Sequence, residues 1–385
     1  MMNRNYKIFP FANGVQIELS GFEFEKGVSE YHFIIQNTNS TLTFDEQLDA
    51  LMKARNAVEK KELFDVEIVF ERFFLSDAAN QQRQVEYAVS HVSDHAVSII
   101  GQAPLNGTKV ALWIYAQSGV ETLPAKDGLF VVRSGAYRHF WGARAVCRGS
   151  DSRIQTEGIL REYSKALHKC GCELSKNSLR TWFFVQEIDF NYGGVVEARN
   201  RVFKEHNLTR DTHFIASTGI AGRMADTENI VVMDTYAVSG LNESQIRYIS
   251  APTHLNPTYQ YGVSFERGTR IDYGDRCHVL VSGTASIDNK GHVMHHGDIR
   301  KQTARMIENV EALLNDADCG YEDISHIIVY LRDCSDFDIV KEIFRSEFPE
   351  IPHIITLAPV CRPGWLIEME CMAIKEQKDN NIASF

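Results

Sequence analysis

The chain has 385 residues and a net charge of −11, with 44% hydrophobic and 24% charged residues. This length is enough for two or three domains, each with a core of its own. The negative charge argues against a nucleic-acid partner, because phosphate backbones are bound through lysine and arginine. An anionic small molecule would therefore depend on a few placed arginines.

The start of the chain has no apolar run long enough for a signal peptide, and no stretch of about 20 apolar residues predicts a membrane span. We therefore expect a cytoplasmic protein without a membrane partner. The eight cysteines are scattered, and the closest pair, Cys170 and Cys172, lacks the spacing of a zinc or redox site. The adjacent His295 and His296 would point to opposite faces of an extended chain, so we expect no metal site.

Helical and strand patterns alternate along the chain in three successive copies. In the first copy we expect strands at residues 32–35, 66–75 and 97–100 and helices at residues 44–60 and 80–92. In the second copy we expect strands at residues 129–133 and 181–185 and helices at residues 154–167 and 192–206. In the third copy we expect strands at residues 277–282, 324–331 and 366–374 and helices at residues 299–314 and 333–348.

Three such copies predict an α+β fold of tandem units, each a mixed sheet with helices on one face. We expect the units to span residues 1–125, 126–250 and 251–385, with a disordered tail after about residue 376. Three similar units in one chain can close into a ring with a pseudo-threefold axis, so we expect a monomer or a weak homo-oligomer.

The third copy alone carries two reactive side chains near its end, Cys361 and Glu368. The stretch APV at 358–360 matches APL at 103–105, with a constant offset along the chain. This offset predicts that Asn106 replaces Cys361 and Trp113 replaces Glu368 in the first copy. The second copy has Ala221 at the predicted cysteine position.

The third copy resembles the reactive-intermediate deaminase family, also known as Rid, YjgF or endoribonuclease L-PSP-like proteins. The segments that carry this resemblance are VSGTASID, GDIRKQT, DISHIIVYLRDCSDF, APVCRP and IEMECMAI. The resemblance implies ligand sites in clefts between neighbouring units. The deaminases of this family carry an arginine shortly after a proline, and residues 352–356 have none. This difference weighs against imine deamination.

Residues 179–374 resemble more closely the chorismatases, which are built on the same fold. The matching segments are RTWFFV, ARNRVF, ASTGI, QYG, SFERG, SGTASI and CRPGWLIEME, in that order. Within that group, Cys361 and Gly268 are typical of the enzymes that form 3-hydroxybenzoate. The segment at 255–264 is shorter than the corresponding segment of the group.

Glu368 is the candidate acid, because a carboxyl group in a partly apolar cleft keeps its proton. Its neighbours Ile367 and Met369 are apolar. Glu370 lies on the same face of the predicted strand and is the alternative acid. From local sequence alone, a strand glutamate is more often exposed.

The resemblance gives Cys361 the role of nucleophile, and the neighbouring Arg362 would favour its thiolate. We expect Arg267 to bind a substrate carboxylate through its planar fork, with Tyr261 donating to the same group. The ASTGI turn, which contains Thr218 and Gly219, could offer backbone N–H groups to an anion. With Gly268, these residues complete the predicted substrate-binding set.

The resemblance therefore predicts an enzyme that converts chorismate to 3-hydroxybenzoate and pyruvate without a cofactor. Two alternatives stay open. One is a Rid-type imine or enamine deaminase or hydrolase of small metabolites, and the other is a ligand-binding protein without catalysis. Ribonuclease activity fits poorly with the net charge.

Overall fold

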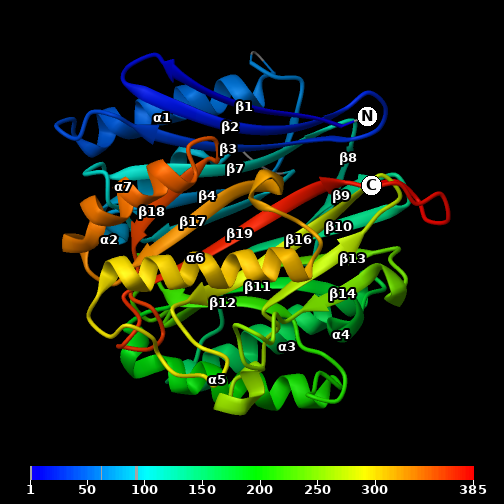
Figure 1. Ribbon diagram of the computed structural model, residues 1–385. Coiled ribbons are helices and arrows are strands. Elements are labelled where there is room, and N and C mark those ends of the chain that lie inside the picture. Colours follow the sequence, from blue (N-terminus) through cyan, green and yellow to red (C-terminus); the bar gives the residue numbers. More distant parts are fainter. Residues whose placement is uncertain (1, 62, 92–93) are drawn as a thin grey trace.

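The fold is a computed structural model that describes residues 2–61, 63–91 and 94–385. Three mixed sheets follow one another along the chain and pack around a common centre, with their helices on the outside (Figure 1). We call the parts of the chain that build these sheets the first, second and third units. The sheets change between β7 (Val110–Ser118) and β8 (Glu121–Lys126), and between β13 (Val231–Ser239) and β14 (Ile246–Ile249).

The strands follow the same plan in each unit. The first sheet has the order β1-β2-β3-β7-β4-β5, with β1 (Met2–Phe11), β2 (Val15–Phe24), β3 (Ser29–Asn37), β4 (Glu67–Leu75) and β5 (Ala96–Gly101). The second has the order β12-β11-β13-β10-β9-β8, with β9 (Leu129–Ser134), β10 (Tyr137–Ala145), β11 (Ser178–Val185) and β12 (Ala216–Ala221). The third has the order β14-β15-β16-β19-β17-β18-β6, with β15 (Gly268–Asp272), β16 (Arg276–Ala285), β17 (Ile324–Leu331), β18 (His353–Leu357), β19 (Ile367–Glu376) and β6 (Ala103–Pro104) from the first unit.

Two main helices cover each sheet, as the periodicity predicts. They are α1 (Phe44–Glu59) and α2 (Ala78–Ala88), then α3 (Ser152–Lys169) and α5 (Ile188–Glu205), with the short α4 (Leu174–Asn177), and finally α6 (Ile299–Asp316) and α7 (Phe337–Glu347). Side chains of Thr43, Asp151 and Asp298 cap the first amides of α1, α3 and α6. The expected end of the second helix at residue 92 lies outside the described residues.

The three units are joined by equivalent backbone contacts at the ends of their parallel strands. The amide of Gly101 donates to the carbonyl of Arg223 at 2.8 Å, and that of Ala221 donates to Pro359 at 3.0 Å. Leu357 pairs with Ala103 in the same way. Each unit therefore contacts the next, and the ring closes within one chain. No helix in the described ranges is long and apolar enough to cross a membrane.

The strand pairing corrects the repeat register predicted from the sequence. The first residues of β7, β13 and β19 pair with the last residues of β4, β11 and β17, respectively. The second residues are therefore structural equivalents, and they are Ala111, Val232 and Glu368. The prediction that Trp113 occupies the Glu368 position is wrong, since Trp113 corresponds to Glu370.

The same argument places the counterparts of Cys361. The residue lies four positions after the end of β18, and the same position after β5 and β12 holds Leu105 and Ala225. The predicted counterparts Asn106 and Ala221 are therefore wrong. The matching APL and APV letters are shifted by one residue relative to the strand ends. Only the third unit still carries reactive groups at these two positions.

The predicted disordered tail is also wrong. Residues 377–385 fold back onto the second and third units, where the amide of Gly274 and the hydroxyl of Tyr137 both donate to the carbonyl of Ala383. Phe385 is only 3% exposed, with its ring 4.8 Å from that of Tyr273 and 4.9 Å from that of His139. Burial of this aromatic ring gives the segment a reason to be ordered.

Candidate active site

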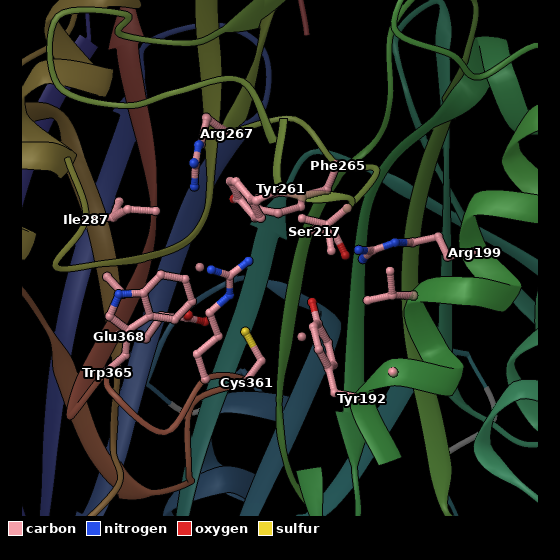
Figure 2. A pocket seen from close by; sticks show the side chains of 17 residues that line it. Tyr192, Arg199, Ser217, Tyr261, Phe265, Arg267, Ile287, Cys361, Trp365 and Glu368 are labelled. Atoms are coloured by element: carbon pink, nitrogen blue, oxygen red, sulfur yellow. The ribbon is translucent and has the colours of Figure 1, made fainter. Parts of the chain in front are cut away.

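A pocket with about 860 Å³ of empty space lies between the second and third units (Figure 2). The second unit supplies one wall from α5 and β12, and the third unit supplies the other from β16, β19 and the loop that holds Cys361. The segment before β15, with the short 3₁₀ helix Thr258–Tyr261, contributes Tyr261, Phe265 and Arg267. Both reactive side chains singled out in the sequence line this pocket.

Glu368 is 5% exposed and lies on β19, where it faces the pocket. A Cβ atom on Gly283 of the neighbouring strand would lie 2.2 Å from its Oε1, so only glycine leaves room for this carboxyl group. Burial raises the pKa of Glu368 to about 8, helped by the negative charge of Glu370 and opposed by Arg180 and Arg267. The group is therefore protonated at neutral pH and can act as an acid.

Glu370 is buried behind the pocket rather than in its wall. Its carboxylate accepts hydrogen bonds from Arg180 Nη2 at 2.7 Å, from Trp182 Nε1 at 2.8 Å and from the hydroxyl of Thr218. Glu370, the alternative acid predicted from the sequence, is therefore held by hydrogen bonds to these three side chains. Thr218, predicted to contact substrate, instead supports Glu370 and does not line the pocket.

Cys361 is half-buried and lies near the hydroxyl of Tyr192 in the pocket (Figure 2). Burial raises the pKa of its thiol to about 12, and the carboxyl of Glu368 adds to this shift. Arg362 acts in the opposite direction, as predicted, but it is the smaller influence. The resting residue is a neutral thiol, so a thiolate would have to form during the reaction.

Arg267 and Arg362 both line the pocket, as predicted. Arg267 is buried, and its Nη2 donates to the backbone carbonyl of Asn256 at 3.0 Å and to the side-chain oxygen at 3.2 Å. Arg362 lies 4.7 Å from the ring centre of Tyr261 and 5.2 Å from that of Trp365. The two aromatic rings hold its guanidinium in the pocket while its N–H groups stay available.

Arg199 is a pocket residue that sequence reasoning missed. It is 1% exposed, and its Nε and Nη2 have no hydrogen-bond partner among the described residues. Its side chain points from α5 into the pocket (Figure 2). The ARNRVF segment contained it, and the spacing of Tyr192, Val196 and Arg199 along one helix face was the signal that could have found it.

The two predicted glycines have different surroundings. Gly219 lines the pocket, and a Cβ atom there would lie 2.7 Å from the ring of Tyr192. Gly268 does not line it, and a Cβ atom there would lie 2.6 Å from the side chain of Ile249. The structure therefore shows a packing requirement at Gly268 and does not place it in the pocket wall, where substrate contact was predicted. Within the described ranges, no group of three His, Cys, Asp or Glu side chains could hold a metal ion.

The model of the family Endoribonuclease L-PSP matches residues 273–375. A RutC family protein of Pyrococcus abyssi is 36% identical over 100 residues, which cover 26% of this chain and 79% of that protein. The chain belongs to the RutC family. Another relative, the 3-aminoacrylate deaminase RutC of Acinetobacter baylyi, is 31% identical over 97 residues, covering 25% of this chain and 77% of its own length.

A crystal structure of chorismatase extends the comparison of this RutC-family chain to all three units. It superposes with a TM-score of 0.63, covers 80% of this chain and 92% of the chorismatase chain, and shares 18% identity. At this identity the likeness concerns the fold, and it confirms the predicted α+β architecture of tandem units. The family match itself is confined to the third unit, where Cys361 and Glu368 lie.

Proposed function

We propose that this RutC-family protein is a chorismatase-like enzyme that converts chorismate to 3-hydroxybenzoate and pyruvate. The observation that carries this proposal is a buried carboxyl group, Glu368, that is protonated at neutral pH in a pocket with Cys361 and three arginines. In a protein with a net charge of −11, these three arginines give an anionic substrate a local positive site.

The pocket matches the chemical groups of chorismate, which has two carboxylates, a ring hydroxyl and an enolpyruvyl ether. Arg199 and Arg362 have N–H groups free for bidentate contacts with carboxylates, and Arg267 has one guanidinium nitrogen left. Trp365 and Ile287 supply an apolar wall against which the ring can lie.

The first chemical step is protonation of the methylene carbon of the enol ether by Glu368. The ether C–O bond then breaks as the oxygen of the ring hydroxyl bonds to the ring carbon and the hydroxyl proton returns to the Glu368 carboxylate, which releases pyruvate and leaves an arene oxide. The thiol of Cys361 adds to this epoxide, its sulfur bonding to the ring and its proton going to the epoxide oxygen, and loss of the sulfur as thiolate together with one ring proton regenerates the thiol and gives the aromatic product. Chorismate has the same atoms as 3-hydroxybenzoate plus pyruvate, so the sequence consumes no cofactor.

The deciding experiment is incubation of the purified protein with chorismate, followed by chromatography for hydroxybenzoates and enzymatic measurement of pyruvate. We expect equal amounts of 3-hydroxybenzoate and pyruvate. Saturable binding of chorismate without pyruvate above the background rate would instead support the alternative of a binding protein.

Replacement of the thiol tests the second step separately. Cys361→Ala should still release pyruvate, with its product diverted from 3-hydroxybenzoate to a dihydrodiol acid. The matched control is Cys334→Ala, which changes an exposed cysteine outside the pocket. Unchanged 3-hydroxybenzoate output from Cys361→Ala would remove the thiol from the mechanism.

A second candidate is deamination of imines or enamines, favoured by the relationship to a 3-aminoacrylate deaminase. The lack of an arginine in residues 352–356 weighs against it. Accelerated release of ammonia from an enamine substrate would support it. A cytoplasmic location and a monomeric or weakly oligomeric state stay predictions.

A further inference from the structure

Two neighbouring carboxyl groups on one face of β19 have opposite environments. Glu368 is 5% exposed and Glu370 is 4% exposed, so neither gains much from water. Glu370 accepts hydrogen bonds from three side chains of the second unit, namely Arg180, Trp182 and Thr218. No hydrogen bond to the Glu368 carboxyl group is found in the described part of the chain.

Two buried carboxyl groups this close along a strand cannot both be ionised without a large cost. The negative charge goes to the group whose oxygens are hydrogen-bonded and paired with a cation, which is Glu370. The proton therefore stays on Glu368. A pair of identical groups with separated protonation states is a recurring way to make one of them an acid.

We propose that Glu370 is a positioning residue, whose fixed charge, held across the boundary between the second and third units, keeps on Glu368 the proton that the substrate takes. Glu370 does not touch the pocket and acts only through Glu368. The kinetic consequence rests on the proposed function, whereas the protonation state of the free protein does not.

The other groups around Glu368 do not supply the same effect. The charged or titratable side chains that face it are Arg180 from β11, Arg267 from the end of the segment before β15, Tyr330 from β17, Tyr192 from α5 and Cys361. The two arginines favour the ionised form, and the phenols and the thiol are neutral because burial raises each pKa. The facing strand β16 presents Gly283 and Ala285, which carry no charge.

The equivalent positions in the other units support this division of roles. Asp234 of the second unit, the counterpart of Glu370, is paired with Arg72 of the first unit at 2.9 Å. Trp113 of the first unit stacks on His326 of the third with ring centres 4.3 Å apart. The position equivalent to Glu370 therefore contacts a neighbouring unit in each of the three units. The third unit alone has a second carboxyl group two residues earlier, because the equivalent residues Val232 and Ala111 are apolar.

The test is a titration of the full chain with ¹³C-labelled glutamate side chains, followed by NMR. In the wild-type protein we expect one buried carboxyl to titrate near pH 8, and Glu368→Gln should remove this signal. Glu370→Gln should lower the midpoint of Glu368 by about one pH unit or more, and Glu370→Asp should keep it close to the wild-type value. An unchanged midpoint in Glu370→Gln overturns the proposal.

A second readout covers the case in which Glu370→Gln fails to fold. In the wild-type protein, the buried carboxyl signal that titrates near pH 8 must be the one that Glu368→Gln removes, and assignment of that signal to another carboxyl group overturns the proposal. In the kinetic arm, the pH profile of pyruvate release should shift with the NMR midpoint, while exposed Glu342→Gln should leave it unchanged. No pyruvate release together with the expected NMR shift would reject the proposed function and keep the role of Glu370.

Discussion

The junction between the second and third units and the junction between the first and second units are built from equivalent elements, yet only the former holds the pocket with Cys361 and Glu368. At the junction of the first and second units, Arg144 extends from an irregular part of β10, where its φ is +56°. Its Nε donates to the carbonyl of Val97 at 3.1 Å, and its Nη1 donates to Glu86 at 2.8 Å. This arginine bridges the two units.

Arg199 at the other junction is more deeply buried and has two nitrogens without partners. A buried guanidinium without acceptors is costly in a folded protein unless a ligand supplies them. The contrast shows how one fold yields a structural junction or a binding site. The deciding difference is whether the arginine finds its acceptors within the chain.

The largest expected effect is on catalysis at the junction of the second and third units, which holds the acid Glu368. Glu368→Gln should lower kcat for pyruvate release by about 10²–10⁴-fold, because the amide cannot protonate the enol ether. The measurement is a coupled pyruvate assay with chorismate as substrate. Glu342→Gln, on the exposed side of α7, is the control that should keep full activity. A nearly active Glu368→Gln would mean that the acid lies elsewhere.

The two arginines provide a direct test of the comparison. Arg199→Met should raise KM by about 10–100-fold through loss of a charged hydrogen bond to substrate, with the free energy of unfolding unchanged or increased. Arg144→Met should leave KM unchanged and lower the free energy of unfolding by about 1–3 kcal/mol, because Glu86 and Val97 lose their partner. Kinetics and urea denaturation of both variants measure this. The comparison fails if the two variants behave alike.

A smaller effect concerns stability and pH. Because burial raises the pKa of Glu368 from 4.5 to about 8, the stability that its proton contributes is fully present below about pH 4.5 and is lost as the pH rises through 8. Glu368→Gln cannot ionise. Its free energy of unfolding should exceed that of the wild type by on the order of a few kcal/mol above pH 8 and match it near pH 4.5. Thermal unfolding across this pH range checks the sign, and a constant difference would contradict it.

Periodicity predicted the two main helices of each unit and strands such as β4, β11 and β17, because the side chains that face each sheet repeat at helical or alternating spacing. It missed β2, β7, β10 and β13, and the ASTGI segment, predicted as a turn, forms strand β12. The choice of Glu368 as a buried acid came from the repeat comparison and the family resemblance, since local sequence alone favours an exposed strand glutamate. The sequence could not show which residues are equivalent in the three units, because matching segments such as APL and APV do not mark the ends of paired strands. The strand ends correct the predicted equivalence, placing Ala111 and Val232 at the Glu368 position.

The two predicted binding residues that do not line the pocket share a physical cause. Thr218 and Gly268 lie in segments that approach the site, but their side-chain positions are occupied by contacts with other strands, to Glu370 and to Ile249. Arg199 was missed for the opposite reason, since a lone arginine in a helix is usually exposed. Each depends on contacts between distant parts of the chain, which local patterns do not encode.

The stretch with the family match, residues 273–375, contains the thiol and both carboxyl groups. The donors that hold Glu370 and the unpartnered Arg199 lie outside it, in the second unit. A third unit without the second unit would therefore keep Cys361, Glu368 and Glu370 but lose the contacts that make Glu368 an acid. Evolution of such a site has to alter two units in different ways, which a fused chain permits and a ring of identical subunits does not.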